Sequence, residues 1–212
     1  LLSQTYGASP TDVAYGLITQ RMLAVLWLFS VPCIAIFATS QFTFAAIGLQ
    51  PATVEFTSRY CHVTLFAIPP FMLSQVARRY LQNQNVPVPV MVSQLAGTVL
   101  IPGTLYLFMF TFGLGFEGAA WAWVFVTTVV SLTLVLYIRF FFKGLRNTWG
   151  GVSVKECFSE WGPIFRNGVP SWGLAILTFG LFELNNLAGG FLPTTDLAAF
   201  SITLTLFFIL WD

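Results

Sequence analysis

Charged residues are scarce in this chain. Lys, Arg, Asp and Glu together make up 8% of its 212 residues, whereas 57% are hydrophobic and the mean hydropathy is +0.80. Soluble domains carry about 25% charged residues, so the composition excludes a soluble globular protein. The apolar runs are continuous rather than alternating, which excludes an outer-membrane barrel. The sequence therefore predicts an all-α integral membrane protein, a polytopic helix bundle in a lipid bilayer.

Residues that commonly carry enzyme or metal chemistry are also few. There is one histidine, His62, and the three cysteines Cys33, Cys61 and Cys157 form no CxxC pair. We interpret the cysteines as small buried hydrophobes and His62 as a packed or interfacial side chain. No catalytic residue, metal site or cofactor is predicted, and a membrane-embedded enzyme is disfavoured for lack of a polar cluster. The dispersed basic residues form no stripe, so no nucleic-acid partner is expected.

The two ends of the sequence look internal to a longer protein. The chain starts at Leu1 without a signal peptide, and its last apolar run has only fifteen residues (197–211). A spanning helix needs about 20. We therefore expect an internal fragment of a longer protein.

Four earlier runs are long and apolar enough to span a bilayer. The predicted spans are 22–42, 59–77, 90–112 and 119–138. Pro32 should kink the first of them, the doublet Pro69-Pro70 lies within the second, and Pro102 should break the third. Gly118, Ala119 and Ala120 are small and should allow two helices to approach closely at the start of the fourth.

Residues 139–166 form the most polar stretch. Within it, Ser153 followed by Glu156 predicts a capping box that opens a short helix. Val154, Phe158 and Trp161 would share one face of that helix, which favours an amphipathic helix at the membrane surface.

The positions of the basic residues provide a check on the predicted topology. If the chain crosses the bilayer once per span, eight of the nine fall on one side, and only Arg59 falls on the other. The eight are Arg21, Arg78, Arg79, Arg139, Lys143, Arg146, Lys155 and Arg166. The positive-inside rule assigns that side to the cytoplasm.

A single acid, Glu183, lies deep in the next apolar stretch, 167–193. A charge at the bilayer centre costs at least about 2.5 kcal/mol, so such a residue indicates an ion or substrate path. On a helical wheel its face also carries Trp172, Phe179 and Asn186, whereas the opposite face is mostly leucine. A carboxylate in such surroundings could exchange protons against a cationic ligand held by the aromatic rings. The alternative is a pairing that only fixes helix packing.

Short motifs then give a resemblance to a known family. They are LSQTYGA (2–8), TQR (19–21), RYLQNQ (79–84), GLGFEGAA (113–120), PS (170–171), FE (182–183) and GFLP (190–193). In this order and spacing, the chain resembles the multidrug and toxic compound extrusion (MATE) family, in particular its eukaryotic branch.

The resemblance implies about half of a twelve-helix, two-lobe transporter. Residues 1–138 would be the end of the N-lobe, from the end of helix 2 through helix 6. Residues 139–166 would be the cytoplasmic connector between lobes, and 167–212 the start of the C-lobe, with helix 7 and a truncated helix 8.

The implied function is a secondary active antiporter that exports organic cations or other metabolites in exchange for protons or sodium. The resemblance puts Glu183 in the coupling or substrate role. Its helical face adds Asn186 as a second coupling residue and Trp172 and Phe179 as possible cavity aromatics. A lipid or oligosaccharide flippase of the same superfamily is one alternative. A truncated, non-functional transporter fragment, whose 212 residues alone enclose no pathway, is another. The plasma membrane and a vacuolar or other internal membrane both remain open.

Overall fold

The computed structural model describes residues 7, 14–48, 51–189 and 202–205. The chain divides into two compact units, Leu1–Trp161 and Gly162–Asp212. Every regular element in the described ranges is a helix. Three of them are long and apolar enough to cross a membrane, at Ala14–Ala38, Val88–Thr111 and Gly115–Phe140. The predicted all-α membrane fold is confirmed.

The first predicted span is helical but begins earlier than expected. Helix α2 covers Ala14–Ala38, with Pro32 inside it, and a short helix α3 (Ser40–Ala46) follows after Thr39. The sequence placed the start after Arg21 because a charge usually marks the membrane edge. Arg21 instead lies within the helix, where its charge is satisfied by polar partners described below.

The second predicted span is a helical path in three pieces. Helix α4 (Pro51–Thr64) leads through a 3₁₀ turn, η1 (Leu65–Ala67), into α5 (Ile68–Gln82). The two prolines Pro69 and Pro70 stand in the first turn of α5, where their missing N–H groups remove no helical hydrogen bond. The path is thus longer than predicted, and its interruption falls just before the proline doublet.

The third predicted span corrects the expectation for Pro102. Helix α6 (Val88–Tyr106) runs through this proline without ending, so the predicted break is wrong. The helix changes only at η2 (Leu107–Thr111), a π-helical turn in which the Phe112 N–H reaches the Leu107 carbonyl at 2.9 Å. Neighbouring helices can satisfy the carbonyl that a proline frees in a membrane helix.

Helix α7 (Gly115–Phe140) confirms the fourth span and the close approach at its start. A Cβ added to Gly118 would lie 2.7 Å from the backbone carbonyl carbon and oxygen of Phe108. Ala120 is fully buried. Small residues therefore let the start of α7 touch the backbone of η2.

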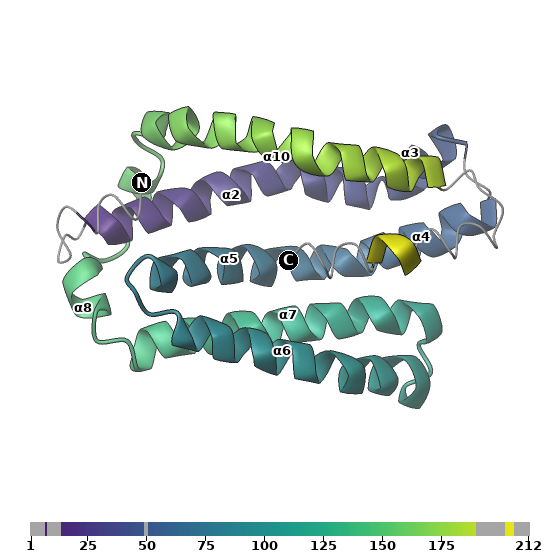
Figure 1. Cartoon of the computed structure of the whole chain (residues 1–212), viewed down its shortest axis with the longest axis horizontal. Coiled ribbons are helices and arrows are strands. Elements are labelled where there is room, and N and C mark those ends of the chain that lie inside the picture. Colours follow the sequence, from purple (N-terminus) through teal and green to yellow (C-terminus); the bar gives the residue numbers. More distant parts are fainter. Residues whose placement is uncertain (1–6, 8–13, 49–50, 190–201, 206–212) are drawn as a thin grey trace. The chain divides into compact units, whose positions relative to one another are not determined.

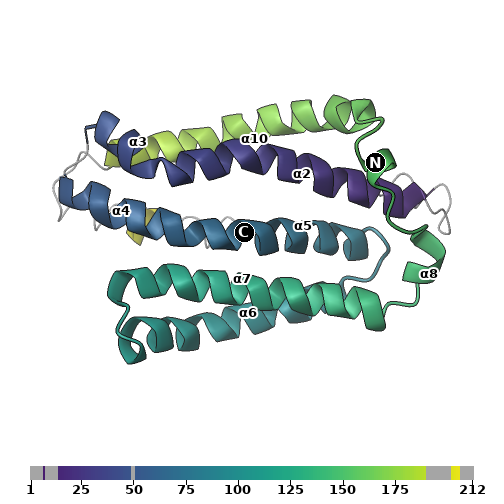
Figure 2. The same cartoon turned by 180° about the vertical axis from the view of Figure 1, so that it is seen from behind.

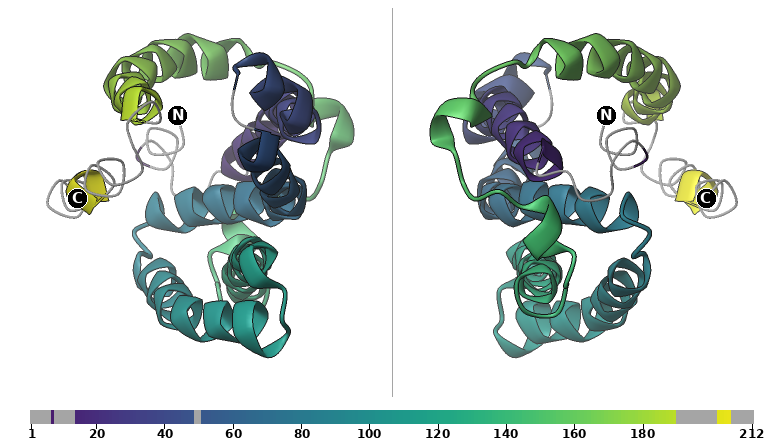
Figure 3. Two further views of the ribbon diagram at one scale, coloured as in Figure 1. Left: turned by 90° about the vertical axis from the view of Figure 1, so that its right-hand side faces the viewer. Right: turned by 90° about the vertical axis from the view of Figure 1, so that its left-hand side faces the viewer.

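The core of the first unit lies between α5, α6 and α7. It is built from Ala77, Leu81, Val90, Val126, Val130 and Leu134. Figures 1 and 2 show α6 and α7 side by side, with α5 next to them. The end-on views in Figure 3 place the α4–α5 path between α2 on one side and the α6–α7 pair on the other.

Basic residues gather at one end of this unit, as the charge pattern predicts. The start of α2, the end of α5 and the end of α7 share that end (Figure 1), and Arg79 and Arg139 stand in the last turns of α5 and α7. Arg59 belongs to α4, which lies toward the opposite end of the unit (Figure 1). It pairs with Glu55 at 2.6 Å and with Glu117 at 3.6 Å.

Residues 144–161 follow α7, and we call them the connector arm. It contains α8 (Leu145–Thr148) and α9 (Val154–Cys157). A helix does start after Ser153, but it is only four residues long and Ser153 makes no side-chain cap, so the predicted capping box is wrong. Phe158 is 65% exposed and Val154 is 68% exposed. The arm is shaped by polar bonds to α2 rather than by an apolar helical face.

The second unit begins with α10 (Gly162–Gly189), which has Pro170 inside. It starts five residues before the predicted 167, because Gly162 and Pro163 open it and proline is well tolerated in a first turn. Residues 202–205, in the last predicted span, are helical. The remaining residues of that span lie outside the described ranges.

The cysteines and the histidine give a mixed outcome. All three cysteines are free, but only Cys157 is buried, while Cys61 is half-buried and Cys33 is exposed. The prediction of buried hydrophobes is thus wrong for Cys33. His62 is exposed and lies 3.1 Å from the Ala38 carbonyl at the end of α2, as an interfacial side chain would.

Candidate functional site

The predicted ion-coupling residues stand on α10. This helix has 28 residues, and its only charged residues are Arg166 and Glu183. At 1.5 Å per residue, Glu183 lies about 32 Å along the helix from Gly162. The side chains of Glu183 and Asn186 lie outside the described part of the structure. The helix therefore places these two residues one turn apart, and their role remains a prediction.

The predicted cavity aromatics are exposed. Trp172 is 67% exposed and Phe179 is 60% exposed, and the leucines of the opposite face, Leu174 and Leu177, are 67% and 70% exposed. Burial within this chain therefore does not separate the two faces of α10. The rings of Trp172 and Phe179 are accessible for contact with a ligand or with another part of a longer protein.

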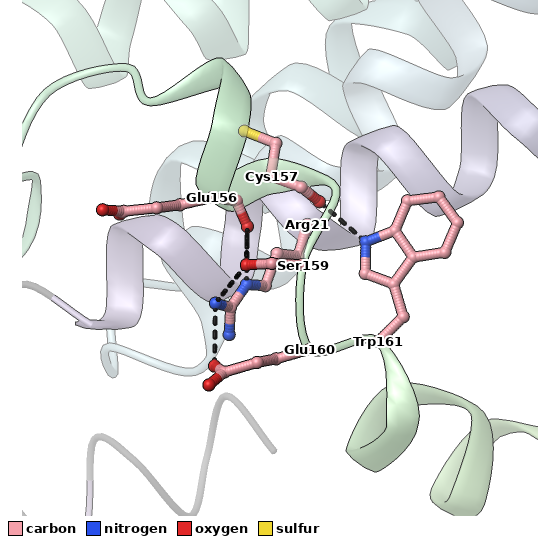
Figure 4. A network of polar contacts seen from close by, with 6 residues as sticks. All are labelled: Arg21, Glu156, Cys157, Ser159, Glu160 and Trp161. Atoms are coloured by element: carbon pink, nitrogen blue, oxygen red, sulfur yellow. Dashed lines mark hydrogen bonds and ion pairs between the residues drawn. The ribbon is translucent and has the colours of Figure 1, made fainter.

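A polar site that sequence reasoning missed lies where the connector arm meets α2. The guanidinium of Arg21 donates through Nε to the Glu156 carbonyl at 3.0 Å and through one terminal nitrogen to the Ser159 hydroxyl at 3.3 Å. The same nitrogen pairs with the Glu160 carboxylate at 2.9 Å. Figure 4 shows Arg21 surrounded by these groups of the arm. One arginine thus holds the end of the arm with three contacts.

The arm is also stiffened from within. The Ser159 hydroxyl donates to the Glu156 carbonyl at 2.9 Å, and the indole N–H of Trp161 donates to the Cys157 carbonyl at 2.7 Å (Figure 4). Glu160 has a φ of 53°, in the left-handed region that non-glycine residues rarely adopt. These local bonds and the ion pair offset the cost of that conformation.

Gln20, the neighbour of Arg21, fixes the first half of the arm. Its amide nitrogen donates to the Gly151 carbonyl at 2.6 Å, and its amide oxygen accepts from the Ser153 N–H at 3.2 Å and the Cys157 thiol at 3.3 Å. Gln20 is 8% exposed and Cys157 is 9% exposed. A buried amide that satisfies three groups specifies one docking position, because any shift would leave buried polar atoms without partners.

Tyr80 of α5 contacts both α2 and the connector arm. Its hydroxyl lies 2.7 Å from the Thr148 hydroxyl, and its carbonyl accepts from the Tyr15 hydroxyl at 3.0 Å. Trp149 packs edge-on against the Tyr80 ring at 6.1 Å. At Gly16, an added Cβ would lie 2.7 Å from the Thr148 carbonyl, so the arm crosses α2 directly on its backbone.

We call this set of contacts the arm clasp: Tyr15, Gly16, Gln20 and Arg21 of α2, Tyr80 of α5, and residues 148–161 of the arm. The sequence carried a signal for it. Two of the motifs that gave the family resemblance, TQR at 19–21 and RYLQNQ at 79–84, place polar residues at adjoining helix ends. Both motifs meet in the clasp.

Beside the clasp, α2, α5, α7 and Trp149 line a partly open cavity of about 480 Å³. Its walls are mostly apolar, and its polar lining comes from Thr19, Gln20, Tyr80 and Arg139. Among the described residues, no group of three or more His, Cys, Asp or Glu side chains could hold a metal ion. The cavity can thus accept an apolar or amphipathic molecule, and its lining offers no acid–base pair for catalysis.

Comparison with known proteins gives consistent matches. The family model described as MatE matches residues 1–107. Multidrug and toxin extrusion protein 1 of Oryctolagus cuniculus is 31% identical over 211 residues, covering 100% of this chain and 37% of that protein. Its counterpart in Homo sapiens is 31% identical over 212 residues, covering 100% of this chain and 36% of that protein. The chain therefore spans little more than a third of the relatives it matches.

A second type of relative and a solved structure agree. Multidrug and toxin extrusion protein 2 of Pongo abelii is 30% identical over 200 residues, covering 94% of this chain and 34% of that protein. The crystal structure of the eukaryotic MATE transporter AtDTX14 superposes with a TM-score of 0.82 at 24% identity, covering 97% of this chain and 46% of that one. At this identity the superposition establishes the fold.

Proposed function

The chain belongs to the MatE family, and from this membership we propose that the full-length protein is a secondary active antiporter. It would export organic cations or other xenobiotics and metabolites by alternating access, in exchange for protons, with sodium as the alternative coupling ion. The relatives named multidrug and toxin extrusion proteins support export of this substrate class. They also support a transport role rather than an enzymatic one.

The observation that carries the proposal is the acid within α10. Glu183 stands in a helix of 28 residues whose only other charge is Arg166, 17 positions earlier. In our proposal α10 crosses the bilayer, where an acid marks an ion or substrate path. In our proposal Glu183 exchanges a proton for a cationic substrate, Asn186 binds beside it, and Trp172 and Phe179 contact the organic part of the substrate through their ring faces.

The test uses the full-length protein in proteoliposomes with an imposed pH gradient. Uptake of a fluorescent organic cation is followed for the wild type and for Glu183→Gln, which keeps the size of the side chain but cannot carry the charge. We expect the variant to lose gradient-driven transport. Glu156→Gln is the matched control, because the Glu156 side chain is exposed and only its carbonyl takes part in the arm clasp.

The outcomes separate the alternatives. Unchanged gradient-driven uptake by Glu183→Gln would remove this residue from coupling. Uptake that follows a sodium gradient but not a pH gradient would assign sodium as the coupling ion. No cation flux in any gradient, together with movement of a fluorescent lipid across the bilayer, would favour the flippase.

A further inference from the structure

The cavity beside the arm clasp is lined unevenly. The apolar part of its wall is formed by Leu23, Leu73, Val76, Ala77, Val135 and Ile138, the polar part by Thr19, Gln20, Tyr80 and Arg139, and Trp149 completes the lining. Its volume of about 480 Å³ lies within the usual range of small-molecule sites. All lining residues belong to the first unit, so the cavity is a feature of that unit alone.

Most of the polar side chains in the wall already make hydrogen bonds within the protein. The Thr19 hydroxyl donates to the Tyr15 carbonyl, both ends of the Gln20 amide bind the connector arm, and the Tyr80 hydroxyl contacts Thr148. Arg139 differs from them. It is exposed in the last turn of α7, and in the part of the chain that the structure describes it makes no hydrogen bond or ion pair. The lining residues that the structure describes include no acid.

The charged and apolar groups lie at different depths. Arg139 is one helical turn closer to the end of α7 than Val135, and Thr19 is one turn closer to the start of α2 than Leu23. Both helices are long and apolar enough to cross a bilayer, so this end of the cavity would lie near the interface. A cation at the interface with an apolar hollow beneath it matches an amphipathic anion.

We propose that this cavity binds an anionic phospholipid, with its headgroup phosphate on Arg139 and one acyl chain against Leu23, Leu73 and Val76. Basic pockets between helices on the cytoplasmic side hold acidic lipid headgroups in other membrane proteins. The basic end of this unit has the matching charge. A soluble anion would not explain the apolar wall, and a neutral lipid would not use Arg139.

Binding is tested on the full-length protein by native mass spectrometry in detergent, with phosphatidylglycerol or phosphatidylcholine of identical chains. We expect the wild type to retain one phosphatidylglycerol about fivefold more tightly than phosphatidylcholine. Arg139→Gln should remove this preference. Arg79→Gln is the matched control, because Arg79 is exposed at the same end but does not line the cavity, and it should keep the preference.

A second variant tests the apolar wall. Leu73→Trp fills the cavity and should lower the retention of both lipids, with its fold checked by thermal unfolding. Equal retention of the two lipids by the wild type would overturn the proposal. An equal effect of Arg79→Gln and Arg139→Gln would also overturn it, because general surface charge would then explain the preference. The readout is lipid binding, so it does not depend on transport.

Discussion

Arg21 and Glu160 form an ion pair of 2.9 Å between α2 and the connector arm, and its two members differ greatly in exposure. The side chain of Arg21 is 12% exposed, whereas that of Glu160 is 75% exposed. An exposed carboxylate adds little because water screens it. Arg21 therefore stabilises the arm mainly through its bonds to the Glu156 carbonyl and the Ser159 hydroxyl, rather than through its ion pair with Glu160.

This asymmetry predicts unequal effects of two charge-removing substitutions. Arg21→Gln should loosen the arm and lower the free energy of unfolding by about 1.5–3 kcal/mol, the usual range for hydrogen bonds to a charged group. Glu160→Gln should cost less than about 1 kcal/mol. Hydrogen exchange of residues 150–161 measures the local effect, and thermal unfolding in detergent measures the global one.

The dependence on salt concentration is the control for these two substitutions. Raising the ionic strength should reduce the small effect of Glu160→Gln further, since exposed charges are screened, and should leave most of the Arg21→Gln effect in place. Equal exchange rates in the arm for the wild type and Arg21→Gln would contradict the clasp.

Gly118 permits the second prediction. In Gly118→Ala the new Cβ would meet the Phe108 backbone at 2.7 Å, so α7 and η2 would have to separate. We expect a loss of about 1–3 kcal/mol, as for other overpacked sites, measured as a lower Tm. Gly103→Ala in α6 is the matched control because nothing lies within 4 Å of its added Cβ, and it should be neutral or stabilising by up to about 1 kcal/mol. A similar Tm for both variants would show that the contact at Gly118 is not tight.

The existence of the helices could be predicted from hydropathy, whereas their ends could not. Arg21 illustrates the reason, because the sequence does not show that a charge inside a helix is satisfied by groups more than 130 residues away. Pro102 illustrates another, since a proline in an apolar helix breaks it only where neighbours leave its freed carbonyl unsatisfied. Ser153 and Glu156 matched a capping box by spacing, but the backbone N–H of Ser153 is taken by Gln20.

The candidate site divides in the same way. Glu183 can be proposed from the sequence because a lone acid in an apolar run that crosses a bilayer is costly whatever surrounds it, and its role stays a prediction. The cavity beside Arg139 forms only where α2, α5, α7 and Trp149 pack together. The spacing of these segments in the sequence does not predict it. The TQR and RYLQNQ motifs carry the family resemblance in the sequence, but their physical role is visible only in the structure, where both contact the connector arm.

Tyr80 gives the third prediction. The Thr148 hydroxyl donates to the Gly144 carbonyl at 2.9 Å, so its single hydrogen is used and Tyr80 must donate to it at 2.7 Å. Tyr80→Phe removes this bond and should cost about 0.5–1.5 kcal/mol of unfolding free energy. In a double-mutant cycle with Thr148→Val, the two losses should not add. Full additivity in thermal unfolding would mean that the hydroxyls do not interact.

The fourth prediction concerns the aromatic residues of α10 and rests on the proposed antiport. Trp172→Ala and Phe179→Ala remove exposed rings that would attract an organic cation by about 0.5–2 kcal/mol, so the KM for an organic cation should rise about 2- to 30-fold. Gradient dependence should persist because Glu183 is retained. Leu177→Ala, on the opposite face and 70% exposed, is the control and should leave KM unchanged. Transport assays in proteoliposomes measure KM and the dependence of transport on the gradient. If Leu177→Ala raises KM as much as the two aromatic substitutions, the helix face of Glu183 is not the face that binds substrate. The assignment of Trp172 and Phe179 then fails. The assignment of Glu183 is decided separately, by the transport assay of Glu183→Gln.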